Sequence, residues 1–202
     1  MAAKLLTSWE NFSKDSGVPL ESGGTNDNYF IFNGINLTDD DVQSQTVKIG
    51  IYQTNDNKVY AFASTDTQAE NIPPTSTNIT ETTQNEPEDE NNSETPEETP
   101  TTNATLIASG TGTLGTDKKI TGIAITLQGG ESVETFNKLA FGGDAITDIK
   151  GSDSADTVYI IGKASDNDTN AISNSVKLDF QKGEDTVIFT NASTVSQISG
   201  GG

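Results

Sequence analysis

The fold class is decided by the alternating stretch Val47-Lys48-Ile49-Gly50-Ile51-Tyr52, the turn Asn55-Asp56-Asn57, and the returning stretch Val59-Tyr60-Ala61-Phe62. Both stretches are rich in β-branched and aromatic residues, while Asn and Asp favour a tight turn between them. Upstream, the run Tyr29-Phe30-Ile31-Phe32 ends at Asn33-Gly34, a strong hairpin dipeptide. These signals predict a meander of three or more strands.

Similar signals continue toward the C-terminal end, where short apolar runs alternate with clusters of Gly, Asp, Asn and Ser. The expected strands are residues 105–109, 120–127, 145–149, 157–161, 175–180 and 186–190. Their spacing is typical of a sandwich, a jelly-roll-like unit or an irregular β-solenoid. The chain is therefore predicted to be mainly β.

Residues 3–14 have a different pattern. Leu5, Trp9 and Phe12 recur at helical spacing, and Gly17 ends the pattern, so we expect a short N-terminal helix. Its apolar face could dock on a partner through these three side chains or pack on its own domain. The sequence leaves both interpretations open.

The middle of the chain, residues 66–104, holds ten carboxylates, no lysine and five of the six prolines. Such a segment cannot bury enough apolar surface to offset its ordering entropy. We expect a disordered acidic linker that joins two small antiparallel β units. One comprises residues 1–65 and serves as an anchoring unit, and the other comprises residues 105–202.

The composition excludes whole classes of chemistry. The 202 residues include 30 Asp and Glu against 11 basic residues, all of them lysine, for a net charge of −19, and they contain no Arg, His or Cys. Cys or His zinc sites, Ser-His-Asp triads and Cys nucleophiles therefore cannot be built. The acidic surface repels nucleic acid, and no apolar run reaches membrane-spanning length. We predict a protein that is not an enzyme, needs no cofactor and binds neither nucleic acid nor the membrane interior.

An aspartate recurs two residues ahead of an apolar run, at Asp27, Asp156 and Asp185. An aspartate at a turn accepts backbone N–H bonds and so begins a strand. Calcium binding is the alternative role for these carboxylates.

The nonapeptide Gly151-Ser152-Asp153-Ser154-Ala155-Asp156-Thr157-Val158-Tyr159 resembles the calcium-binding repeat of RTX proteins. Its first Gly, its Asp and its apolar residue match, while Ser152 and Ser154 stand where the repeat has Gly. Residues 178–189 are similar to the D-F-x-x-G-x-D-x-I segment that often follows RTX arrays, so the resemblance covers residues 151–189. It implies Asp153 and Asp156 as calcium ligands, calcium-stabilised folding and signal-less export.

Two functions are compatible with these observations. The first is a structural or display protein of an assembled particle, in particular a virion component of capsid-decoration, knob or tail-fibre type. It would be assembled in the host cytoplasm, because no secretory signal is visible. Its partners would be other structural proteins of the particle and further copies of this chain, in a homotrimer for example. The alternative is an extracellular, calcium-responsive RTX-like surface or matrix protein.

Overall fold

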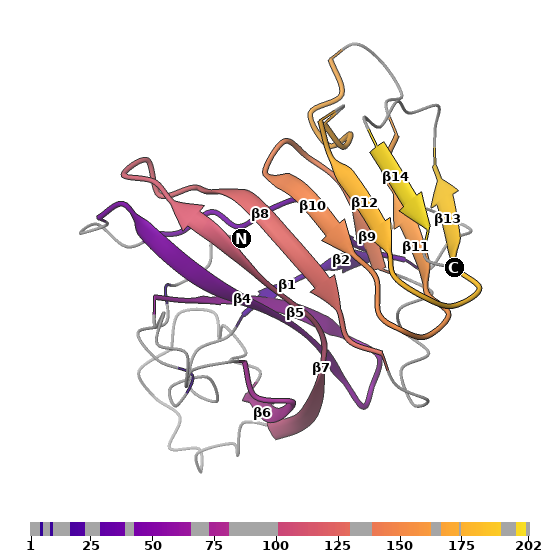
Figure 1. The fold of residues 1–202 in the computed structure, drawn as a ribbon. Coiled ribbons are helices and arrows are strands. Elements are labelled where there is room, and N and C mark those ends of the chain that lie inside the picture. Colours follow the sequence, from indigo (N-terminus) through magenta and orange to yellow (C-terminus); the bar gives the residue numbers. More distant parts are fainter. Residues whose placement is uncertain are drawn as a thin grey trace, which may run out of the picture.

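A computed structural model describes residues 5, 9, 17–22, 29–38, 43–65, 73–80, 101–129, 139–162, 167–173, 175–190 and 197–200. Within these ranges the chain is built from strands in two sheets, and no helix is present (Figure 1). The mainly β character predicted from the sequence is confirmed. The predicted N-terminal helix over residues 3–14 lies outside the described residues except for Leu5 and Trp9.

The first sheet has the strand order β1-β5-β4-β7-β8-β10-β12-β14, and β6 also pairs with β7. Its members are β1 (Val18–Pro19), β4 (Gln45–Thr54), β5 (Val59–Ser64), β6 (Ser76–Thr80), β7 (Thr101–Leu114), β8 (Ile120–Leu127), β10 (Ile146–Lys150), β12 (Lys177–Phe180) and β14 (Gln197–Gly200). The run Phe30–Phe32 lies in the other sheet and pairs in parallel with Leu139–Phe141, so the predicted meander with the hairpin at Asn33-Gly34 is wrong. The predicted hairpin at Asn55-Asp56-Asn57 is confirmed, because β4 pairs antiparallel with β5 from Lys48–Ser64 to Gln53–Val59. The turn at Asn57, which has a φ of 63°, closes it.

The second sheet has the order β13-β11-β9-β3-β2. Its members are β2 (Glu21–Ser22), β3 (Phe30–Phe32), β9 (Leu139–Phe141), β11 (Thr157–Ile160) and β13 (Thr186–Phe189). The strands expected from residues 105 onward coincide with β7, β8, β10, β11, β12 and β13 to within a few residues at each end. The pattern indicates neither β9 nor β14. It predicts a short helix over residues 131–140, of which Leu139 and Ala140 belong to β9 instead, while residues 131–138 lie outside the described residues.

From β8 onward, successive strands alternate between the two sheets and form a coil. β8, β10, β12 and β14 pair in parallel in the first sheet, and β9, β11 and β13 pair in parallel in the second. Among the architectures expected for residues 105–202, this arrangement agrees with the irregular β-solenoid. The expectation of antiparallel units is wrong for these strands. Alternating apolar residues look alike in both arrangements, and the pairing direction is set by connections that cross to the opposite sheet.

Both sheets bury one face in a shared core. The inward positions of the coil lie in register, with Ile149 between Ile125 and Leu178 in the first sheet and Phe141 between Phe32 and Ile160 in the second. All of these side chains are at most 1% exposed and belong to one cluster. The rings of Phe32 and Phe141 meet edge to face at 6.3 Å. One core therefore fixes the spacing of the two sheets and the position of the turns between them.

The first sheet also crosses the predicted linker. β4 pairs with β7 along ten positions, from Gln45–Leu114 to Thr54–Ala104, so residues on either side of 66–104 share one sheet. The two β units that were expected to be separate are therefore joined in one sheet through β4 and β7. Within the predicted linker, residues 76–80 form β6, and residues 101–104 begin β7. Residues 66–72 and 81–100 lie outside the described residues.

A second apolar cluster explains why part of that segment is ordered. It contains Trp9, Tyr52, Tyr60, Phe62, Ile79, Ala104 and Leu106. The single aliphatic side chain of β6, Ile79, is 1% exposed, and the Tyr52 hydroxyl donates a hydrogen bond of 2.9 Å to the Pro74 carbonyl. The apolar partners of this segment come from the hairpin rather than from its own sequence. The composition of residues 66–104 alone therefore does not predict strand β6.

Candidate functional site

The two turns that carry the RTX-like resemblance lie against each other in the coil. Residues 151–156 connect β10 to β11, and residues 181–185 connect β12 to β13. Parallel pairing of β11 with β13 sets Thr157 opposite Thr186, so Asp156 and Asp185 precede paired positions. The recurrent aspartate of the sequence thus marks equivalent places in adjacent turns of the coil. Asp27 lies outside the described residues.

Hydrogen bonds join the two turns directly. The Asp156 N–H donates to Asp185 Oδ1 at 2.9 Å, and the Thr186 N–H donates to the Asp156 carbonyl at 2.7 Å. Gly183, with a φ of +120°, approaches the first turn closely, since a Cβ there would lie 2.6 Å from the Ser154 carbonyl atoms. Only glycine adopts this backbone conformation without strain and leaves room for that approach. The sequence predicted a glycine-containing turn here, and the structure gives the physical reason for it.

Asp156 is the buried acid of this site, with an exposed fraction of 1%. Its carboxylate accepts the Ser152 N–H at 2.7 Å and the Ser152 hydroxyl at 3.1 Å. Burial raises the pKa of the Asp156 carboxyl, the bonds from Ser152 oppose that increase, and the nearby Asp185 charge adds to it. The Asp156 carboxylate therefore holds the 151–156 turn together through hydrogen bonds on its buried side. This agrees with the strand-beginning role that the sequence suggests for this aspartate.

Ser152 explains the departure from the RTX-like repeat. It stands at the second repeat position, where the pattern has Gly, and its hydroxyl reaches both carboxylate oxygens of Asp156. The Ser154 N–H in turn donates to the Ser152 hydroxyl oxygen at 3.1 Å. The Ser152 hydroxyl thus contacts the two carboxylate oxygen atoms of Asp156 that a calcium ion at this position would need as ligands. Sequence reasoning named Asp153 and Asp156 but missed Ser152, although its place in the repeat was the signal.

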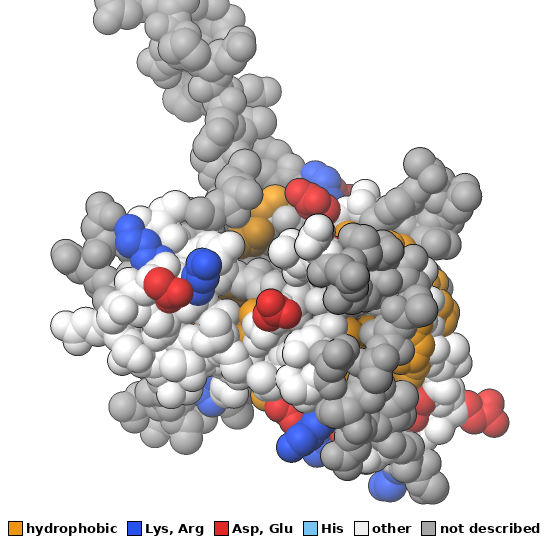
Figure 2. Space-filling model, turned by 90° about the horizontal axis from the view of Figure 1, so that it is seen from above, with side chains coloured by type: hydrophobic (Ala, Val, Ile, Leu, Met, Phe, Trp, Pro, Cys, Tyr) orange, Lys and Arg blue, Asp and Glu red, His pale blue; other side chains and the backbone are white. Residues whose placement is uncertain are grey.

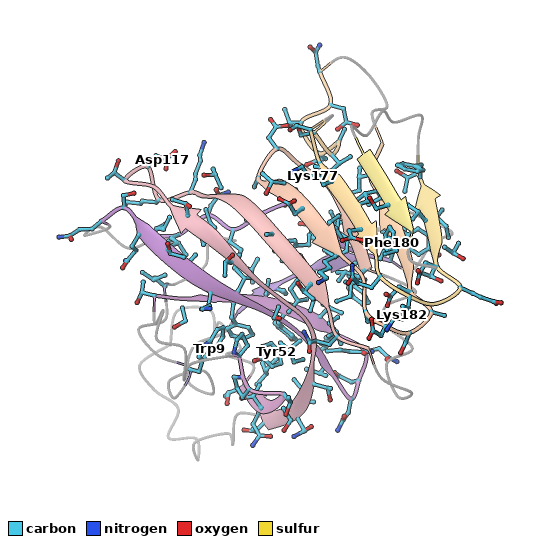
Figure 3. All side chains as sticks on the ribbon, viewed as in Figure 1. Trp9, Tyr52, Asp117, Lys177, Phe180 and Lys182 are labelled. Atoms are coloured by element: carbon cyan, nitrogen blue, oxygen red, sulfur yellow. The ribbon has the colours of Figure 1, made fainter. Side chains whose placement is uncertain are left out.

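The other predicted ligand, Asp153, lies in a different environment. Its carboxylate is exposed and pairs with Lys182 Nζ at 3.6 Å, across the gap between the two turns. Figure 3 shows Lys177 at the first residue of β12 and Lys182 beyond the strand's other end, near this turn. Asp153 and Asp156 therefore have separate partners. Among the residues that the structure describes, no three carboxylates come together as a group that could hold a metal ion.

A second feature, with charged residues among its lining, lies on the outer face of the first sheet, over β8, β10, β12 and β14. It is an open depression of about 350 Å³ whose lining includes Thr126, Asp148, Lys150, Lys177, Asp179 and Ser199. Register sets Asp148 opposite Lys177 and Lys150 opposite Asp179, so charges of opposite sign alternate across two strands. Such a face offers donors and acceptors to a polar partner surface. No motif marked it, because its residues are far apart in sequence.

The predicted docking residues make contacts within their own chain. Trp9 is 8% exposed and packs in the cluster with Tyr52, and Leu5 packs against the main core. Figure 3 shows Trp9 and Tyr52 close together below the hairpin strands. These contacts agree with the interpretation in which the segment packs on its own domain. Phe12 lies outside the described residues.

Comparison with known proteins adds no family. No family model, curated protein or solved structure matches this chain. The part of the chain that the structure describes also contains no helix long and apolar enough to cross a membrane.

Proposed function

We propose that this chain is a non-enzymatic structural and display protein of an assembled particle, of the capsid-decoration, knob or tail-fibre type. The observation that carries the proposal is the shared core, in which strands from both sides of residues 66–104 build one framework. A coil of parallel strands on such a core is a rigid support, and stacked repeats create extended surfaces for binding. Rigidity and surface are what a display protein requires.

The outer face of the first sheet is the surface that this framework would present. Its in-register charge pairs, Asp148 with Lys177 and Lys150 with Asp179, leave it locally balanced although the whole chain carries a net charge of −19. A balanced polar face avoids the long-range repulsion that a uniformly acidic surface imposes on an acidic partner. We therefore assign this face to contact with other structural proteins of the particle.

The test is sedimentation of the natural assembly. Cells that produce the protein are lysed, particles are separated on a density gradient, and the chain is quantified by mass spectrometry in each fraction. The proposal expects the chain in the particle fraction at a fixed ratio to the major particle protein. Part of the chain should also remain bound to the particles in high salt. Recovery only as free protein in the cytosol or medium would overturn it.

A calcium-responsive, RTX-like extracellular protein is the second candidate, favoured by one specific observation. β-Roll calcium sites need ligands from adjacent turns, and the Asp156 and Asp185 turns are adjacent and hydrogen-bonded. Circular dichroism and thermal melting with millimolar Ca²⁺, and with Mg²⁺ as the control, separate the candidates. A Ca²⁺-specific gain of β signal and melting temperature would favour the second candidate. Identical curves would remove it, because the contacts from Ser152 already satisfy the Asp156 carboxylate.

A further inference from the structure

The edges of the two sheets differ in how they are protected. β1 carries Pro19 and β2 is a two-residue strand that carries Glu21, both of which hinder the addition of another strand. β13, the other edge of the second sheet, has the sequence Thr-Val-Ile-Phe, without charge, proline or glycine. An uncharged apolar edge strand of this kind is a template for strand addition.

The side chains of β13 are exposed in a way that is unusual for this molecule. Within the described ranges, the exposed large hydrophobic residues are Ile188 at 36% and Phe189 at 37%. Phe189 is in register with Ile160, which is fully buried. The row of inward-facing side chains that is buried at β11 therefore becomes exposed at β13. Viewed from above, hydrophobic side chains gather at the right-hand flank in Figure 2, the side on which β13 lies in Figure 1.

The backbone N–H and C=O groups of alternate β13 residues point in opposite directions. The Thr186 N–H donates to the Asp156 carbonyl and the Thr190 N–H donates to the Ile160 carbonyl, so alternate residues of β13 bond to β11. In a parallel ladder the intervening residues direct their N–H and C=O groups to the other side. Val187 and Phe189 therefore direct their backbone groups away from β11. In the described part of the chain, β11 is the one strand that pairs with β13.

We propose that β13 pairs with β13 of a second copy of this chain, antiparallel, about a two-fold axis at Ile188. This register sets Val187 of one copy opposite Phe189 of the other, so the outward backbone groups of both residues form the ladder. It also sets the two Ile188 side chains next to each other on the outer face, beside Tyr159, whose ring stacks on Tyr29 at 5.2 Å. The pairing covers the apolar groups that a single copy leaves exposed.

Charge favours this arrangement between two strongly acidic molecules. β13 carries no charge, and the nearest carboxylates, Glu184 and Asp185, precede its first residue. An antiparallel pair centred on Ile188 separates Asp185 from its counterpart by six strand positions, about 20 Å. That distance exceeds the Debye length of about 8 Å at physiological salt, so repulsion between the two turns is screened. The inference concerns self-association and stands whether or not the chain belongs to a particle.

Cross-linking through a single introduced cysteine tests the register. The natural chain contains no cysteine, so Ile188→Cys creates a unique thiol at the proposed axis. Residues that face each other without hydrogen bonds in an antiparallel pair have Cα atoms about 4.5 Å apart, within the range of a disulfide. Mild oxidation should convert most of Ile188→Cys to a covalent dimer. The matched control, Thr111→Cys, places an exposed thiol on the central strand β7 and should remain a monomer on a denaturing gel.

Analytical ultracentrifugation of the full chain supplies the second readout. The natural protein should sediment with twice the 21.3 kDa chain mass at micromolar concentration, and Ile188→Lys should shift it to the monomer. Thr111→Lys, which adds the same charge elsewhere, should leave the dimer intact, and circular dichroism of each variant confirms folding. A monomeric natural protein, a trimer, a dimer that persists in folded Ile188→Lys, or equal cross-linking of both cysteine variants would each overturn the proposal.

Discussion

Replacing Asp156 by alanine perturbs the turn site at its most buried polar residue. The carboxylate is the acceptor for the Ser152 N–H at 2.7 Å and for the Ser152 hydroxyl at 3.1 Å. The hydroxyl has a second acceptor, the Ser154 carbonyl at 3.4 Å, and can turn toward it. The Ser152 N–H has no such freedom, so the substitution leaves a buried donor without its carboxylate acceptor.

The size of the effect follows from these contacts. A buried donor that loses its acceptor costs about 1–3 kcal/mol, and removal of the buried charge offsets part of the loss. We expect Asp156→Ala to lower the free energy of unfolding by about 2 kcal/mol. For a chain of this length, that corresponds to a decrease of roughly 4–8 °C in melting temperature.

The matched control is the other aspartate of the same turn. Asp153 is exposed and its ion pair with Lys182 spans 3.6 Å at the surface, so Asp153→Ala should cost at most about 0.5 kcal/mol. Urea denaturation followed by circular dichroism at neutral pH measures both variants against the natural chain. Equal destabilisation by the two substitutions, or no effect of Asp156→Ala, would refute the assignment of Asp156 as the internal closure of the turn.

Three further predictions concern pH, the second turn and the predicted linker. Burial raises the pKa of Asp156 above 3.8, so folding favours the protonated carboxyl. The pH-dependent part of its contribution to stability is full below pH 3.8 and is lost as the pH rises through the raised pKa, while the hydrogen bonds from Ser152 remain. The urea midpoint of the natural chain should accordingly fall relative to Asp156→Asn over that range, and a parallel pH profile would contradict this. Gly183→Ala should cost about 1–3 kcal/mol by urea denaturation, since Cβ would meet Ser154 at positive φ; an unchanged midpoint would mean the turns do not touch. Ile79→Ala should cost about 2–5 kcal/mol, whereas a free linker would tolerate it without change in melting.

Sequence reasoning recovered the local elements of this chain because local patterns determine them. The alternation in Val47–Tyr52 and the turn residues that follow are sufficient to specify the β4–β5 hairpin. The position of Asp156 and Asp185 ahead of apolar runs predicts a strand-beginning role, one of the two roles that the sequence leaves open, and their hydrogen bonds agree with that role. Turn chemistry depends on neighbours in sequence, so a single chain displays it.

The long-range features could not be predicted in the same way. Residues 76–80 lack apolar partners of their own, and the burial of Ile79 depends on the aromatic side chains of the hairpin. The pairing of β4 with β7 joins residues that are fifty or more positions apart, which the composition of the intervening segment cannot reveal. The charge pairs at Asp148 and Lys177 depend in turn on a parallel register that apolar alternation does not specify.

The central structural claim is that the chain before and after residues 66–104 forms one framework, and cleavage between the halves tests it most directly. A recognition site for a sequence-specific protease is inserted within residues 81–100, the purified chain is cut, and the fragments are passed over a sizing column under native conditions. The ten paired positions of β4 and β7 predict that both fragments co-elute at the position of the uncut protein and melt in a single transition. Separation into two independently folded species would contradict the account.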